Sequence, residues 1–166
     1  NKMEGISGFV VEKGTPGLSI GKTEEKLGIR GSNTTEVILE DVKIPLSRRI
    51  GVEGGGWWLM MRTLNRSRPA IGAQAVGIAQ GALDYVIQIG RDRDWFGRRE
   101  ETLVLQSKLA DMAIEIEAAR ALVYKAATMM DAKVKGTPVQ MFSAMSKYYA
   151  SDVAMKVATE AVQIME

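Results

Sequence analysis

The chain has 166 residues, a formal net charge of +2, 46% apolar and 25% charged residues, and neither cysteine nor histidine. These counts fit a globular protein of one domain or parts of two, and they exclude disulfides, thiolate chemistry, a Ser-His-Asp triad and the common histidine metal sites. The small, scattered positive charge speaks against nucleic-acid binding, and the absence of a run of eighteen apolar residues predicts no membrane span.

β-Structure is predicted for the first 50 residues. Short apolar or β-branched runs, separated by turn residues, indicate four strand segments at 6–11, 18–20, 34–39 and 42–44. Residues 14–17 form the clearest turn between them, and Pro45 is expected to stop the last strand.

Three consecutive glycines, Gly54, Gly55 and Gly56, precede a sharp change in composition. This run predicts a hinge or linker between two domains, residues 1–53 and 54–166. A phosphate site at the start of the following helix is the alternative, but neither the P-loop spacing nor the dinucleotide fingerprint is present.

Three long helices are predicted after the linker, at 57–93, 103–133 and 139–166, and each carries an apolar stripe at helical spacing. The stripes are Ile71, Ala75, Ile78, Ala82, Tyr85 and Ile89; then Leu105, Leu109, Met112, Ile116, Ala119, Val123, Ala126 and Met130; then Ala150, Val153, Ala154, Val157, Ala161 and Ile164. Long helices joined by short links imply an up-down bundle. Pro69 removes the helical hydrogen bond to the carbonyl of Asn65, so a kink or a junction of two helices is expected at 65–69.

Asn65 and Arg68 are the first candidate for a binding site. They are three residues apart, so they share one helix face beside the carbonyl that Pro69 frees. Such a polar pair suits a ligand that carries phosphate or amide groups. A solvated basic face with an incidental proline is the alternative that the residues alone leave open.

Segment 91–99 is the second candidate because it places two aromatic residues, Trp95 and Phe96, beside four arginines. Arginine pairs with phosphate, and an aromatic ring can stack on a flat ring such as adenine. Helix capping and core packing are the alternative, with Gly97 as the expected C-terminal cap.

The order of several short motifs resembles the acyl-CoA dehydrogenase family. No motif is specific alone, but together they cover nearly the whole chain: 27–34, 41–45, 68–69, 75–84, 93–97, 108–112, 146–151 and 161–164. The resemblance implies an α+β fold, in which the end of a middle β-domain is followed by most of a C-terminal, up-down helical bundle.

The resemblance also assigns a ligand to each candidate site. Asn65 and Arg68 fall where the family contacts the CoA part of the substrate, although an acid often occupies the position of Asn65.

Arg93, with Trp95 and Phe96 beside it, falls on an arginine that reaches the FAD of a neighbouring subunit. Gln163 falls on the glutamine that opens an FAD-binding turn. Two positions depart from the family pattern, because Leu103 replaces a glutamine that often contacts FAD and Glu166 stands where a glycine is typical.

The resemblance implies FAD-dependent α,β-dehydrogenation of an acyl-CoA thioester to the 2-enoyl-CoA. It also implies that the electrons pass to an electron-transfer flavoprotein and that the enzyme is a homotetramer. A glutamate usually removes the proton next to the thioester carbonyl. One branch of the family carries it where this chain has Ser67, so no catalytic residue is expected here and the base is expected beyond Glu166.

The ends of the chain suggest a piece of a longer polypeptide, because a strand-like stretch starts almost at once and the last residues continue a helical pattern. We expect this piece to be inactive by itself. The expected compartment is a bacterial cytoplasm or the mitochondrial matrix, although no targeting signal can be judged.

Three other interpretations remain open at this point. A flavin oxidase or monooxygenase of the same superfamily is the nearest, and a downstream glutamate would favour dehydrogenation instead. A non-enzymatic helical binding module, such as a nucleic-acid-binding protein of the same fold, is opposed by the modest net charge. A pure oligomerisation bundle would bind no flavin.

Overall fold

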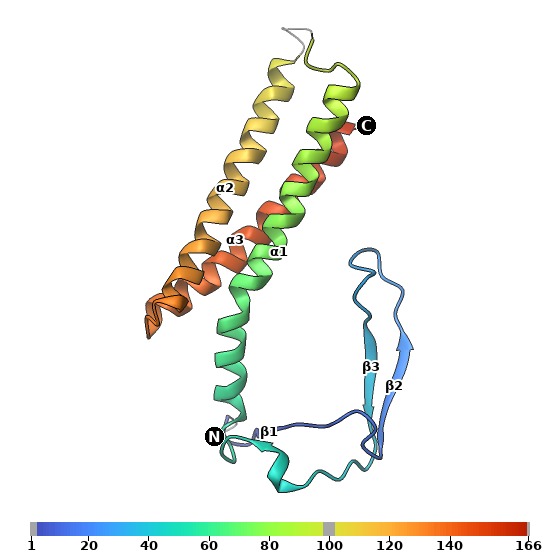
Figure 1. Cartoon of the computed structure of the whole chain (residues 1–166), viewed down its shortest axis with the longest axis vertical. Coiled ribbons are helices and arrows are strands. Elements are labelled where there is room, and N and C mark those ends of the chain that lie inside the picture. Colours follow the sequence, from blue (N-terminus) through green and yellow to red (C-terminus); the bar gives the residue numbers. More distant parts are fainter. Residues whose placement is uncertain (1–2, 98–101, 166) are drawn as a thin grey trace. The chain divides into compact units, whose positions relative to one another are not determined.

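The computed structural model describes residues 3–97 and 102–165, and the chain divides into two compact units, Asn1–Met61 and Arg62–Glu166. Short antiparallel strands make up the first unit and long helices make up the second, so the predicted α+β class with a helical bundle is confirmed (Figure 1).

The first unit contains two separate antiparallel strand pairs. Strand β1 (Gly8–Phe9) pairs with β4 (Arg49–Ile50), and β2 (Leu18–Thr23) pairs with β3 (Thr35–Leu39). The strand predicted at 42–44 is wrong, because Asp41 adopts φ +51° and a 3-10 turn, η1 (Leu46–Arg48), follows Pro45.

Gly54 and Gly56, in the run predicted as a hinge or linker, pack closely against the backbone of residues 4–7. The Gly56 N–H donates to the Ile6 carbonyl at 2.8 Å, and the Gly54 N–H donates to Ser7 Oγ at 3.0 Å. A Cβ atom at either glycine would lie 2.7 Å from a backbone oxygen, of Glu4 or of Ile6, so only glycine fits there.

Three long helices form as predicted: α1 (Gly56–Asp92), α2 (Leu103–Asp131) and α3 (Thr137–Met165). Figure 1 shows α1 as one unbroken helix that bends in its first half, so the alternative of two helices meeting at 65–69 is wrong. At the end of α2, Lys133 adopts φ +53° and the Val134 N–H donates to the Met129 carbonyl, which is a Schellman turn that stops the helix.

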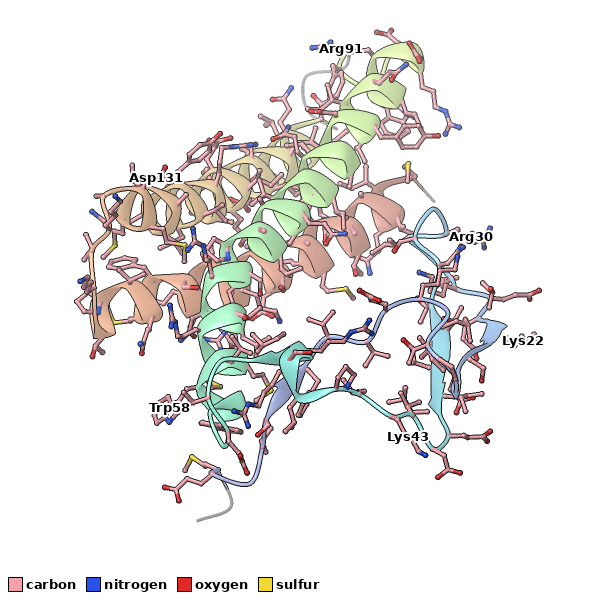
Figure 2. The ribbon with its side chains drawn as sticks, turned by 60° about the horizontal axis from the view of Figure 1, so that its bottom comes forward. Lys22, Arg30, Lys43, Trp58, Arg91 and Asp131 are labelled. Atoms are coloured by element: carbon pink, nitrogen blue, oxygen red, sulfur yellow. The ribbon has the colours of Figure 1, made fainter. Side chains whose placement is uncertain are left out.

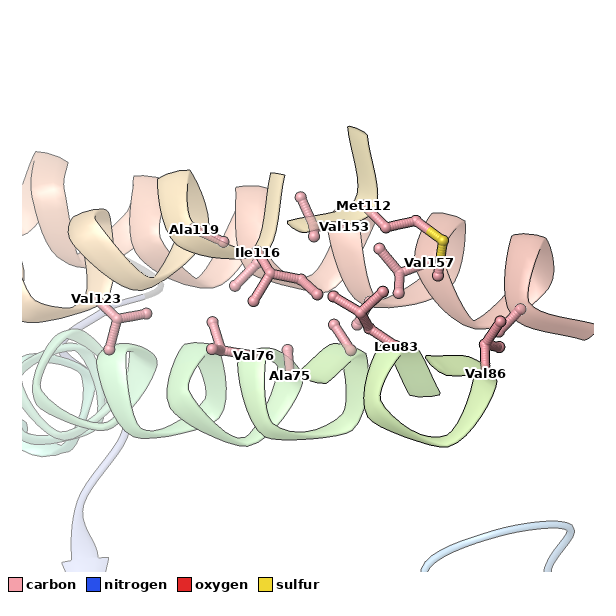
Figure 3. Close-up of a cluster of buried hydrophobic side chains, with 14 residues drawn as sticks. Ala75, Val76, Leu83, Val86, Met112, Ile116, Ala119, Val123, Val153 and Val157 are labelled. Carbon is pink, nitrogen blue, oxygen red and sulfur yellow. The ribbon is translucent and has the colours of Figure 1, made fainter. Parts of the chain in front are cut away.

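Small and branched apolar side chains fill the space between the three helices (Figure 3). The buried stripes predicted for α2 and α3 are confirmed in their central residues. The core members are Met112, Ile116, Ala119, Val123 and Ala126 on α2, and Ala150, Val153, Ala154, Val157 and Ala161 on α3.

The stripe predicted for α1 is wrong at three of its six positions. Ala75 is buried, but Ile71, Ile78 and Tyr85 are 47%, 49% and 55% exposed. The α1 side chains that are buried in the core instead form an adjacent stripe of the helix: Ala75, Val76, Ala79, Leu83 and Val86. Because α1 is apolar on two faces, periodicity alone did not identify the inner one.

Polar side chains connect α1 to α2 at the edge of this core. The Arg120 guanidinium donates to Gln80 Oε1 at 2.7 Å and to Glu117 Oε1 at 2.9 Å, while Gln80 Nε2 donates to Asp84 Oδ1 at 2.8 Å. Hydrogen bonds are directional, whereas apolar contacts are not. This network therefore helps to set how α1 lies against α2.

By length and composition alone, α1 is also apolar enough to cross a membrane, with a mean hydropathy of 1.2 and 33% burial over its most apolar window. One such helix is weak evidence, since a core helix passes the same test. The predicted absence of a membrane span stays a prediction.

Candidate functional site

Asn65 and Arg68 meet on α1 as the sequence predicts. Asn65 Oδ1 accepts a hydrogen bond of 2.7 Å from the Arg68 guanidinium, and both side chains are half-buried. The amide oxygen carries no charge, and within the described residues no carboxylate pairs with Arg68. The guanidinium is therefore held in place while its positive charge stays available to an anion.

The backbone beside this pair is stabilised by a residue that sequence analysis missed. Pro69 has no N–H for the carbonyl of Asn65, and the hydroxyl of Ser143 on α3 donates to that carbonyl instead. Ser143 has no exposed surface. Its position on the inner face of α3 was a detectable signal, since a buried serine requires a hydrogen-bond partner.

The C-terminal end of α1 forms a Schellman turn that presents Arg93, Trp95 and Phe96. The Trp95 N–H donates to the Gly90 carbonyl at 2.9 Å and the Asp94 N–H to the Arg91 carbonyl at 3.2 Å. Asp94 takes the left-handed conformation at φ +51°, so the prediction that Gly97 caps the helix is wrong.

Gly90 lets the two aromatic rings fold back onto the helix. A Cβ atom at Gly90 would lie 2.7 Å from Cζ of Phe96 and 3.1 Å from Cε3 of Trp95. The guanidinium carbon of Arg93 lies 5.7 Å from the centroid of the Trp95 ring, within cation–π range. An exposed cation beside a half-buried aromatic ring fits a ligand with both phosphate and a flat ring, as FAD has.

The other predicted positions within the described residues are exposed on the helices. Gln163 is exposed near the end of α3, and Ser67 donates to the carbonyl of Leu64 at 3.2 Å within α1. Leu103 is 63% exposed at the first turn of α2. Glu166 lies outside the described residues, as do residues 98–101 of the second candidate segment.

The two clusters lie far apart on the same helix. Arg68 and Arg93 are 25 residues apart, which at 1.5 Å per residue corresponds to roughly 37 Å along α1. Figure 2 shows Arg91 at one end of the helical unit and Asp131 at the other. No small ligand spans that length, so each cluster serves a separate site or a separate part of an extended ligand.

A hollow of about 410 Å³ lies at the tip of the β2–β3 hairpin, lined by Lys26, Arg30 and neighbouring polar residues. Sequence analysis did not predict it, and both cations there donate to backbone carbonyls. Within residues 3–97 and 102–165, no three acidic, cysteine or histidine side chains gather to hold a metal ion.

An amide–arginine pair in the first half of α1 and an arginine–aromatic pair just after its C-terminal end are the two candidate ligand contacts of this helical domain. Residues 54–165 match the family model described as the acyl-CoA dehydrogenase C-terminal domain. The chain therefore belongs to the acyl-CoA dehydrogenase family.

Individual relatives agree with this assignment. The chain is 48% identical over 163 residues to cyclohex-1-ene-1-carbonyl-CoA dehydrogenase of Syntrophus aciditrophicus, covering 98% of the chain and 39% of the relative. It is similar to the solved butyryl-CoA dehydrogenase of Megasphaera elsdenii, with a TM-score of 0.87, 45% identity and coverage of 98% and 42%. A solved structure described as the electron transferring flavoprotein of Acidaminococcus fermentans gives a TM-score of 0.88 with 46% identity and coverage of 98% and 42%.

Proposed function

We propose that this chain contributes to an FAD-dependent acyl-CoA dehydrogenase, which oxidises an acyl-CoA thioester to the 2-enoyl-CoA. The observation that carries the proposal is the combined likeness in sequence and fold to named acyl-CoA dehydrogenases over 98% of the chain. Because the chain spans about 40% of the length of these relatives, the activity belongs to a larger protein.

The Asn65–Arg68 pair binds the CoA part of the substrate in this proposal. Its guanidinium is half-buried and has no carboxylate partner in the described part of the chain, so it offers charge to a phosphate. A neutral amide orients the guanidinium without neutralising it, which keeps the net attraction for an anion.

The turn at the end of α1 holds FAD in the same proposal. Arg93 would hold the diphosphate, and Trp95 and Phe96 would hold a flat ring of the cofactor, with Gln163 as a further contact. The cofactor, when bound, would supply the acceptor for the hydride that leaves the carbon next to the one that loses its proton. None of these residues is a base, and the proton is removed by a group outside residues 1–166.

An electron-transfer flavoprotein accepts the electrons and the protein works as a homotetramer in this proposal, in a bacterial cytoplasm or the mitochondrial matrix. The roughly 37 Å between the two clusters is consistent with this arrangement, because it leaves room for one subunit to offer its FAD contact to a neighbouring subunit.

The test is anaerobic titration of the purified product of the complete gene, followed by its visible flavin spectrum. Butanoyl-CoA and cyclohexane-1-carbonyl-CoA form the panel, because a linear and a cyclic saturated acyl group each carry the α- and β-hydrogens that the reaction removes. Bleaching of a bound flavin by either thioester is expected. A flavin that stays oxidised, but turns over with oxygen and another reductant, identifies an oxidase or monooxygenase. A protein without flavin refutes the proposal.

A further inference from the structure

Helices α1 and α3 pack closely at Gly72, about one turn after Arg68 on α1. Gly72 brings the two helices close together, because a Cβ atom there would lie 2.9 Å from the Ser146 carbonyl oxygen and 3.0 Å from Val123 Cγ2. At this separation a serine side chain is long enough to reach the backbone of α1. Ser143 lies on the inner face of α3 and has no exposed surface.

The Ser143 hydroxyl donates to the one carbonyl that the proline leaves without its helical partner, that of Asn65. A buried carbonyl without any partner is destabilised by the lost hydration, so the contact fixes the backbone of Asn65. The side chain of the same residue accepts the hydrogen bond from Arg68 at 2.7 Å. One residue therefore joins the serine on α3 to the guanidinium on α1.

We propose that Ser143 is a positioning residue for the CoA contact: by holding the Asn65 carbonyl, it sets the orientation in which Asn65 presents Arg68 to the ligand. This inference rests on the proposed function, since it concerns the same CoA contact. Ser143 itself touches no ligand, and its effect passes through the backbone of Asn65.

The experiment compares two matched variants of the FAD-loaded full-length protein, Ser143→Ala and Ser146→Ala. Both serines lie on α3 and both have no exposed surface. They differ in their acceptor, because Ser146 donates at 2.9 Å to the Ser143 carbonyl within its own helix. Isothermal titration with coenzyme A gives the affinity, and thermal unfolding gives the stability of each variant.

Ser143→Ala is expected to weaken coenzyme A binding by roughly threefold to tenfold, the effect of one hydrogen bond, while Ser146→Ala leaves the affinity unchanged. With an acyl-CoA substrate, KM rises in Ser143→Ala and kcat is retained. Pro69→Ala supplies a rescue, because an alanine has the backbone N–H that proline lacks and can donate it to the Asn65 carbonyl. The Pro69→Ala/Ser143→Ala double variant should therefore regain the parent affinity.

Equal coenzyme A affinities in the two alanine variants, or a double variant as weak as Ser143→Ala alone, overturn the inference while the dehydrogenase proposal stands. A parent protein that does not bind coenzyme A refutes the proposed function and the inference together. Loss of affinity that follows the loss of thermal stability in both serine variants shows a general packing role and also overturns the inference.

Discussion

Gly72→Ala tests whether the close approach of α1 and α3 is set by this glycine. The added Cβ would meet a backbone oxygen at 2.9 Å and a valine methyl at 3.0 Å. The oxygen belongs to the helical backbone of Ser146 and cannot rotate away, so the two helices must separate. Overpacking of this kind costs about 1–3 kcal/mol, and the better helix propensity of alanine returns about 0.5–1 kcal/mol.

The matched control is Gly77→Ala, five residues further along α1, where no atom beyond the adjoining backbone of α1 lies within 4 Å of the added Cβ. Only the propensity gain applies there, so the variant is expected to be more stable than the parent by about 0.5–1 kcal/mol. Urea unfolding followed by circular dichroism measures both variants against the parent. A Gly72→Ala protein as stable as Gly77→Ala would refute the packing argument.

Three further predictions concern the core, the aromatic turn and an ion pair. Ile116→Ala should cost about 2–5 kcal/mol in urea unfolding because Ile116 is 1% exposed, while Ile114→Ala, at 66% exposure, should stay within about 0.5 kcal/mol. Gly90→Ala should displace the Phe96 ring and accelerate FAD release from the full-length protein, and unchanged release would contradict the proposed cofactor contact. The hydrogen bond from Lys156 to Glu115, and the negative charge of Glu115, raise the pKa of Lys156. The ion pair therefore stabilises the fold fully at any pH below the ordinary lysine pKa. This stabilisation is lost as the pH rises through the raised pKa of Lys156. The difference in urea midpoint between the parent and Lys156→Met should therefore be constant from neutral pH to about pH 9 and shrink above about pH 10.4.

The helices were predictable because their signals are local. Apolar spacing and the Gly136–Pro138 break place α2 and α3 within two residues of their observed bounds. The short strands were less predictable, since β1 and β4 contain two residues each and depend on pairing between residues about 40 apart. Val42 and Ile44 show the consequence, because a strand-like pattern without a partner strand remained irregular.

The candidate sites were predictable as residues but not as contacts. The sequence shows that Pro69 frees the Asn65 carbonyl, yet only the packing of α3 shows that Ser143 satisfies it. Likewise, the composition of segment 91–99 predicts a cation beside aromatic rings. The Schellman turn that arranges them depends on Asp94 taking a left-handed conformation, which glycine usually provides.

The face of α1 that packs against the other helices contains small residues. This explains why the sequence pattern indicated a different face, and why the Ser143 hydroxyl can reach the backbone of α1. Hydrophobic size favoured Ile71, Ile78 and Tyr85, but the face that packs has small residues such as Gly72 and Ala79. Small residues bury less apolar area each, but they let helix backbones approach closely, and that approach lets short side chains make contacts that longer separations prevent. The small residues that make this face look less apolar in the sequence therefore bring the Ser143 hydroxyl within reach of the Asn65 carbonyl. In this way the packing of the helices is connected to Asn65, the residue that holds Arg68.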